Sequence, residues 1–133
     1  MRTIRFRIWD KAEYNWIEPK YASLYTEFDK DNKWNFSVGA VADSGIIISE
    51  FTGLNDDESK PIYEGDIVEF YDEVVGYCKG EICFEAGMFI IACDQLEDSY
   101  IGLNEFANSE GWCDNVRVKG NIYQNPELIK EKE

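Results

Sequence analysis

Histidine is absent from all 133 residues of the chain. Without an imidazole, Ser-His-Asp and Cys-His catalysis, histidine-ligated zinc and a histidine pH switch are excluded. The usual nucleotide-binding motifs are missing too, because neither a G-x-x-x-x-G-K-[ST] loop nor a G-x-G-x-x-G fingerprint occurs. We therefore expect no enzymatic activity, no catalytic residue and no cofactor.

Long hydrophobic runs are also absent. The longest apolar run is Met88 to Cys93, whereas a helix needs roughly 20 apolar residues to span a bilayer. The N-terminus is basic but lacks the apolar stretch and cleavage site of a secretory signal. We expect a cytoplasmic protein without a membrane partner.

Positive charge is scarce, with 13 Lys and Arg against 27 Asp and Glu and a net charge of −14. Such a surface repels phosphate backbones, so direct binding to DNA or RNA is not expected. Residues 1–11 carry four basic side chains against one acidic one, while residues 50–73 carry nine acidic side chains against Lys60 alone. The chain therefore has a basic start and an acidic middle segment.

The four cysteines lack the paired knuckles of a zinc site, and their apolar neighbours indicate small buried hydrophobes. We reject a calcium loop at residues 29–35, because Lys33 and Trp34 occupy positions that its geometry cannot accommodate. The acidic triplet at residues 56–58 is expected on an exposed loop with weak cation binding only. No metal site is predicted.

Short β-rich segments separated by glycine and Asp/Asn turns fill the sequence, and no long amphipathic helix interrupts them. A Gly65-Asp66 turn directly precedes a strand, and residues 85–87 suit a hairpin connection. One helical turn is expected within residues 103–108, and Asn125 is expected to cap a short helix that begins at Pro126. The predicted strands cover residues 2–9, 14–17, 21–28, 34–38, 46–51, 67–70, 76–84, 88–93 and 115–123.

This pattern predicts a mainly β fold, either a small antiparallel barrel or a strongly bent sheet, with elements similar to those of SH3-like barrels. An N-terminal β-hairpin and one or two short helices complete it. We expect a single domain over residues 1–133, with a hairpin and strand region in residues 1–50 and a barrel-like core in residues 51–133.

Several spaced motifs carry a family resemblance. They are Met1-Arg2-x-Ile4-x-Phe6-Arg7-x-Trp9-Asp10, Phe51-Thr52-Gly53-Leu54-x-Asp56, Ile62-Tyr63-Glu64-Gly65-Asp66-Ile67-Val68 and the run from Gly120 to Leu128. Together they resemble the YopX family of phage and prophage proteins, with Phe51 where the family usually has Tyr. The resemblance implies phage or prophage origin in a bacterial cytoplasm, a mainly β fold and self-association, and it implies no particular activity.

Five residues are candidates for a partner or ligand surface. Tyr63, Glu64 and Asp66 combine an aromatic ring with two carboxylates, and Arg5 and Arg7 lie on the basic first strand. The alternatives are a solvated loop edge for the first three, and a solvated strand face that discourages edge-to-edge aggregation for the arginines.

The leading hypothesis is a noncatalytic phage accessory protein that binds a host or phage protein, because the many aromatic residues suit interface anchors. One alternative is an acidic nucleic-acid mimic that occupies a basic nucleic-acid-binding protein. Another is a module that binds a small ligand or forms a structural homo-oligomer, with the arginine strand of one subunit against the acidic segment of the next. A carboxylate enzyme with a divalent metal would require tight metal binding.

Overall fold

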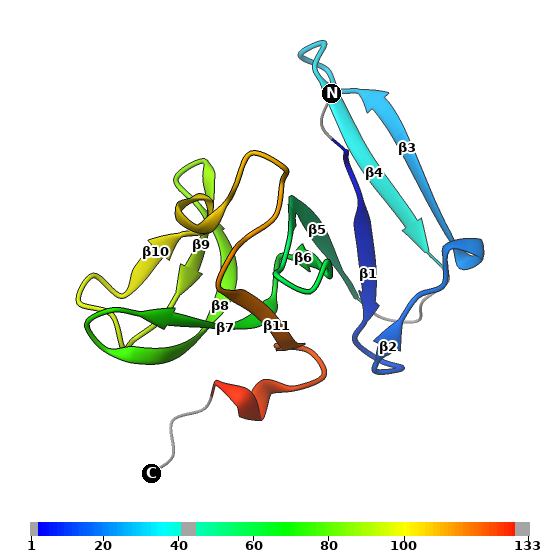
Figure 1. The fold of residues 1–133 in the computed structure, drawn as a ribbon. Helices are drawn as coiled ribbons and strands as arrows, with labels where there is room; N and C mark the ends of the chain where they lie inside the picture. The colour runs from blue at the N-terminus through cyan, green and yellow to red at the C-terminus, as the bar shows by residue number, and fades with distance from the viewer. Residues whose placement is uncertain (1–2, 41–44, 130–133) are drawn as a thin grey trace. The chain divides into compact units, whose positions relative to one another are not determined.

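The computed structural model describes residues 3–40 and 45–129 (Figure 1). Strands dominate these residues, and the helical elements among them are three short 3₁₀ turns. The mainly β prediction is therefore confirmed. The chain divides into two compact units, and the single-domain organisation stays a prediction. Unit 1 comprises residues 1–6 and 49–133, and unit 2 comprises residues 7–48.

Unit 2 is built from two antiparallel hairpins. The predicted N-terminal hairpin is confirmed, with Trp9 opposite Trp16 in the register, although its first strand begins at Phe6 rather than at Arg2, which lies outside the described residues. The second hairpin pairs Phe28 with Trp34. The elements are β1 (Phe6–Asp10), β2 (Asn15–Trp16), η1 (Pro19–Tyr21), β3 (Ala22–Phe28), β4 (Trp34–Ala40) and the first residues of β5 (Ile46–Asn55).

The aromatic core of unit 2 is centred on Trp9, which is 3% exposed. The rings of Tyr14 and Trp16 contact it edge-on, at centroid distances of 5.1 and 5.0 Å. Next to it, the buried Asp10 carboxylate accepts the Ala12 N–H at 2.9 Å and closes the turn between the two strands. Edge-on aromatic contacts and a satisfied carboxylate thus stabilise this short hairpin.

Unit 1 contains a bent five-stranded antiparallel sheet (Figure 1). Its order is β10-β9-β8-β7-β11, so β10 and β11 are its edges in the described chain. The three consecutive antiparallel strands predicted from the sequence are β7, β8 and β9, whereas β10 was not predicted. The strands of unit 1 are the rest of β5, β6 (Pro61–Tyr63), β7 (Asp66–Asp72), β8 (Gly76–Glu85), β9 (Met88–Ala92), β10 (Tyr100–Gly102) and β11 (Val116–Asn121).

The connection between β8 and β9 is a two-residue turn. Ala86 and Gly87 both have positive φ angles, 53° and 80°, and they join the paired residues Glu85 and Met88. Turns with two positive φ angles match the right-handed twist of the flanking strands. The predicted hairpin connection is confirmed.

The core of unit 1 is apolar, and it contains the three buried cysteines, which confirms the packing predicted for them. Cys83 is half-buried, and all four cysteines are free thiols. The core consists of Ile62, Val68, Phe70, Cys78, Ile82, Ile91, Cys93, Leu103, Cys113, Val116 and Val118.

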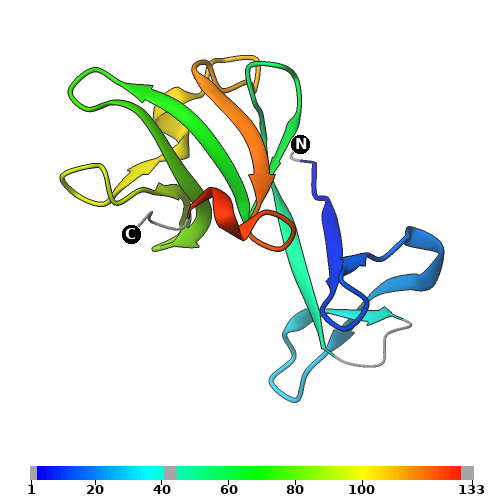
Figure 2. The same cartoon turned by 90° about the horizontal axis from the view of Figure 1, so that it is seen from below.

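Two single helical turns follow the strands of unit 1. The predicted turn after Leu103 is η2 (Leu103–Phe106), and the C-terminal one is η3 (Pro126–Leu128), shown in red in Figure 2. Asn125 takes the N-cap position and Pro126 begins the helix, as predicted, but the Asn125 side chain makes no hydrogen bond to η3. Its Oδ1 instead accepts the Asn121 N–H at 3.2 Å and closes the turn after β11. No helix within residues 3–40 and 45–129 is long and apolar enough to cross a membrane.

Candidate functional site

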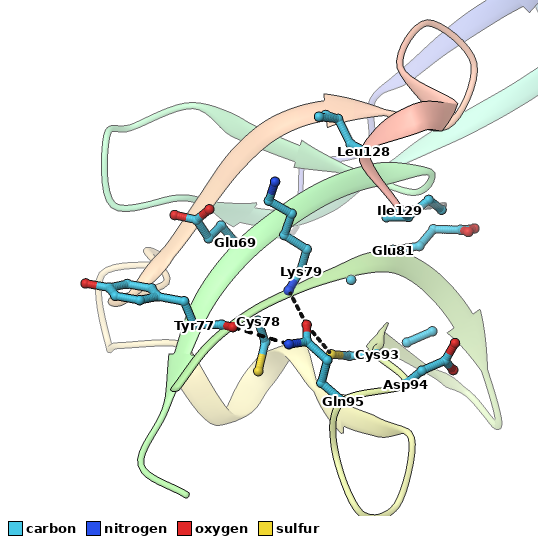
Figure 3. Close-up of a pocket in the computed structure, with 12 residues that line it drawn as sticks. Glu69, Tyr77, Cys78, Lys79, Glu81, Cys93, Asp94, Gln95, Leu128 and Ile129 are labelled. Atoms are coloured by element: carbon cyan, nitrogen blue, oxygen red, sulfur yellow. Dashed lines mark hydrogen bonds between the residues drawn. The ribbon is translucent and has the colours of Figure 1, made fainter. Parts of the chain in front are cut away.

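A groove forms where β8 and β9 separate (Figure 3). The two strands pair from Glu85 and Met88 as far as Glu81 and Ala92. Beyond that point the chain turns away from β8, and the Cys93 N–H donates to the Ser99 carbonyl instead. The fork opens a groove of about 690 Å³, which Leu128 at the end of η3 and Ile129 after it also line.

Gly80 lies next to the last residue pair of β8 and β9 before the fork. A Cβ atom at this position would lie 2.5 Å from the Ala92 carbonyl oxygen and 2.6 Å from the side chain of Ile91. Real Cβ atoms do not approach a backbone oxygen so closely. Any side chain at position 80 would therefore push Ala92 away from β8 and disturb the last pair of the two strands, Glu81 with Ala92.

The side chain of Gln95 lies inside the fork (Figure 3). Its Oε1 accepts the Lys79 N–H at 3.2 Å, and its Nε2 donates to the Tyr77 carbonyl at 3.4 Å. The Cys93 thiol also donates to Oε1, over 3.9 Å. One amide side chain thus supplies the acceptor and donor that the peptide groups of a neighbouring strand would supply.

The rim of the groove combines apolar surface with negative charge (Figure 3). Tyr77 is 74% exposed, and Leu128 and Ile129 line the groove from the C-terminal segment. Charged side chains around it are Glu69, Lys79, Glu81 and Asp94. With three carboxylates and one ammonium, the groove favours a cationic ligand that also has apolar surface.

The Cys78 thiol, which lines the groove, is not an activated nucleophile. Burial, together with the neighbouring Cys93, raises the pKa of the Cys78 thiol to about 11, so this thiol stays protonated at neutral pH. Among the described residues, no group of three or more Cys, Asp or Glu side chains is arranged to hold a metal ion. What the arrangement offers is hydrogen bonding, charge and apolar contact.

The residues predicted as a partner or ligand surface lie in different local surroundings. Asp66 is 2% exposed, and its Oδ2 accepts the Tyr63 N–H at 2.8 Å, so its carboxylate fixes the turn between β6 and β7. The centroids of the Tyr63 and Phe51 rings lie 5.6 Å apart, and the Arg5 guanidinium lies 5.4 Å from the centroid of the Phe51 ring. Arg7 belongs to unit 2, where its guanidinium lies 4.2 Å from the Trp16 ring.

Glu64 is half-buried beside other carboxylates. Burial raises its pKa above the usual value, and the charges of Glu50 and Glu81 raise it further. Its backbone is fixed on both sides, because its N–H donates to the Glu50 carbonyl at 2.9 Å and its carbonyl accepts the Ser49 hydroxyl at 2.6 Å. Glu81, one of the two charges that raise the pKa of Glu64, also lines the groove.

Asp56 is a structural residue, contrary to the expectation of an exposed acidic loop. It is 1% exposed. Its Oδ1 accepts the N–H groups of Glu58 and Lys60 at 2.9 and 2.8 Å, and its Oδ2 accepts the Val118 N–H at 2.9 Å. The carboxylate joins its own loop to β11 next to the register shift between Val118 and Gly120, so it is unavailable to a cation or partner.

The other two members of the acidic triplet are paired. Arg117 binds Asp57 with two hydrogen bonds, of 3.1 and 3.3 Å, and its Nε lies 3.0 Å from Glu58. The hydrogen bonds and charge of Asp57 raise the pKa of Arg117 above its usual value. The triplet therefore fixes a loop to β11.

The central and C-terminal motifs meet at Gly65. This residue has a φ of +86°, and a Cβ atom on it would lie 2.9 Å from the Tyr123 ring. The Ile122 N–H donates to the Gly65 carbonyl at 2.9 Å. These contacts explain by packing why Gly65 and Tyr123 stand in the two motifs.

Sequence reasoning missed the residues of the groove. The fork depends on where the pairing of β8 and β9 ends, and that register is a nonlocal property. Gln95 is one polar residue in a loop and has no local signature. Gly80 inside a β-rich run was the one available signal, since an isolated glycine in a strand indicates a close backbone approach.

Residues 5–130 match the model of the YopX family, described as YopX protein. Among solved structures, protein EF1440 from Enterococcus faecalis is similar with a TM-score of 0.59 and 21% identity, over 98% of this chain and 100% of that one. The yopX protein from Bacillus subtilis is similar with a TM-score of 0.58 and 19% identity, over 100% of both chains. No curated protein matches. At these identities the two structures show the fold alone.

Proposed function

This chain belongs to the YopX family, and from that membership we propose that it is a noncatalytic phage or prophage accessory protein of the bacterial cytoplasm. Its activity is to bind a host or phage protein at the groove between β8 and β9. The observation that carries this proposal is the combination, in one groove, of an exposed aromatic side chain, apolar walls and carboxylates.

The groove has the composition of a protein interface. Tyrosine is enriched among residues that dominate binding energy, because it buries a large ring at little entropic cost. Tyr77 is 74% exposed beside Leu128 and Ile129, so a partner that covers it would gain apolar burial. The surrounding carboxylates then select a partner segment that carries Lys or Arg.

A noncatalytic role is consistent with the thiols and with the composition. Burial raises the pKa of Cys83 and Cys113 to about 12, and the chain has no histidine to act as a general base. Binding through this surface requires neither an activated thiol nor a general base.

The experiment is retention of a partner from bacterial host lysate on the immobilised full chain. Wild type is compared with Tyr77→Ala/Asp94→Lys in the groove, and with Tyr100→Ala/Glu110→Lys as a control of matched chemistry at exposed residues that do not line it. We expect a protein that wild type and control retain and the groove variant loses. Equal retention by all three, or retention of nothing, would contradict the proposal.

Mimicry of nucleic-acid charge is a second candidate, and the net charge of −14 supports it. Its weakness lies in the acidic segment, where Asp56 and Asp66 are buried and Asp57 and Glu58 pair with Arg117. In the same retention experiment, mimicry predicts a basic protein that is released as salt rises and that added DNA displaces. A partner resistant to both treatments favours the groove.

Self-assembly, the third candidate, stays a prediction. It requires the arginines of the first strand to contact the acidic segment of a second copy. Replacing Arg5 and Arg7 with Glu would then lower the mass measured by light scattering, and an unchanged mass would reject that contact.

A further inference from the structure

We propose that the partner binds as an extended peptide, adding a strand to the edge of β8 beyond the fork and displacing the side chain of Gln95. This inference rests on the proposed function, because it names the form of the partner at the same groove. It is carried by the two hydrogen bonds that Gln95 makes to the backbone of β8.

The edge of β8 is the first step. Pairing with β9 ends at Glu81, while pairing with β7 continues to Gly76. The stretch from Gly76 to Gly80 therefore has a strand on one side only in the described chain. At about 3.3 Å per residue, this is an edge on the order of 16 Å long, enough for a short peptide.

Two backbone groups of that edge are hydrogen-bonded to a side chain that an incoming peptide can replace. Tyr77 and Lys79 are two residues apart, so their backbone groups face the same side of the strand. The Tyr77 carbonyl and the Lys79 N–H are the groups that Gln95 satisfies with one side-chain amide. An incoming peptide residue has the same donor and acceptor, so it replaces both bonds when it enters.

Displacing Gln95 costs little. Both of its bonds to β8 lie in exposed surroundings, at 3.2 and 3.4 Å, and water can satisfy the released amide. The main-chain hydrogen bonds deeper in the sheet are buried, whereas these two side-chain bonds are exposed. Gln95 therefore protects an edge that would otherwise be open to unspecific strand pairing.

The side chains of the groove select the sequence of the peptide. Side chains of an added strand alternate in direction, and one set lies on the face of β8 that presents Tyr77, Lys79 and Glu81, where carboxylates and apolar surface occur together. Tyr77 and Leu128 offer that apolar surface. The occupant is accordingly an extended segment that carries Lys or Arg together with aliphatic or aromatic residues on that face.

The test begins with peptides selected from a display library of random dodecapeptides against the immobilised full chain. The best peptide is synthesised with a fluorophore, and its Kd is measured by anisotropy. We expect Tyr77→Ala/Asp94→Lys to weaken binding at least tenfold and Tyr100→Ala/Glu110→Lys to leave it unchanged. Gln95→Ala should tighten it severalfold, because the competing amide is gone.

Backbone pairing is tested with two further peptides, N-methylated at alternate residues in opposite registers. A strand directs alternate N–H groups to opposite sides, so one register should lose binding at least tenfold and the other should retain it. In a two-dimensional ¹⁵N spectrum of the full chain, the Lys79 N–H and the Gln95 side-chain amide should shift on binding. The spectra of the free groove variant and the free control variant should match that of wild type away from the substituted residues.

The outcomes separate this inference from the proposed function. A peptide that depends on Tyr77 and Asp94 but tolerates N-methylation in both registers would overturn strand addition and leave protein binding at the groove in place. Selection of no peptide, with a groove-dependent protein still retained from lysate, would overturn strand addition in the same way. If the groove variant changes neither peptide binding nor retention, both proposals fail.

Discussion

At the scale of single residues, buried carboxylates stabilise the fold by accepting backbone hydrogen bonds. The Asp56 carboxylate accepts hydrogen bonds from three backbone N–H groups, and the carboxylate of Asp66, at the start of β7, accepts one from Tyr63. A carboxylate that accepts several backbone hydrogen bonds joins segments that are distant in the sequence. Here it joins the loop after β5 to β11, 62 residues further on.

Asp56→Ala is expected to lower the free energy of unfolding by about 3 kcal/mol or more, because three N–H groups lose their acceptor and hydrogen bonds to charged groups are worth about 1.5–3 kcal/mol each. The midpoint of urea unfolding measures this. Asp98→Ala at an exposed position is the control, with an expected change within about 0.5 kcal/mol. Equal effects of the two substitutions would show that Asp56 does not hold the loop.

Glu64 gives a pH-dependent prediction. Its pKa is raised above 4.5 in the folded chain, by burial first and by Glu50 and Glu81 second. The folded state therefore binds this proton more tightly than the unfolded state, and stability falls as the pH rises from 4.5 through the raised pKa. Glu64→Gln should be more stable than wild type at pH 7, and its advantage should vanish below pH 4.5. Urea unfolding at both pH values checks this, and an advantage that persists at low pH would contradict it.

At the scale of elements, the regular alternation of apolar and polar residues predicted most strands, because that pattern is local. Residues 76–84 and 88–93 were predicted within one residue of the ends of β8 and β9. β10 was missed because it has only three residues, Tyr100–Gly102, and gains its strand geometry from pairing with β9. The fork and its groove could not be predicted, since they depend on the register at which β8 and β9 part.

The three acidic residues at positions 56–58 show a second kind of failure. Consecutive carboxylates are typical of a solvated loop, and that reading fits Asp57 and Glu58, which pair with Arg117 at the surface. It does not fit Asp56, whose burial depends on the arrival of the Val118 N–H from β11. Local sequence contains no information about that partner.

Gly65 offers a matched test of element packing. Gly65→Ala must accept a positive φ and a contact of 2.9 Å with the Tyr123 ring, whereas Gly53→Ala accepts a similar φ of +90° with nothing within 4 Å. The backbone cost should be about 1–2 kcal/mol in each case. We expect Gly65→Ala to cost more in urea unfolding, and the excess to disappear when Tyr123 is also replaced with Ala. Equal costs in the wild-type background would contradict the contact.

At the scale of the whole molecule, the free thiols report on the integrity of unit 1. Burial raises the pKa of Cys83 and Cys113 to about 12 and that of Cys78 to about 11. At pH 8 we expect Ellman's reagent to label these thiols at least a hundredfold more slowly in the native chain than in urea. Rapid labelling of any of them without denaturant would contradict this packing.

The order of the chain through its two units has a consequence for synthesis on the ribosome. Unit 2 is inserted into unit 1, because residues 7–48 lie between the two segments that form unit 1. The Arg5 carbonyl accepts the Phe51 N–H at 2.9 Å, so Arg5 cannot make this pairing until Phe51 has emerged from the exit tunnel. Closing that loop is slow compared with forming a local hairpin. The hairpins of unit 2 can therefore form during translation, while unit 1 is completed only after its second segment, from Ser49 onward, has been made.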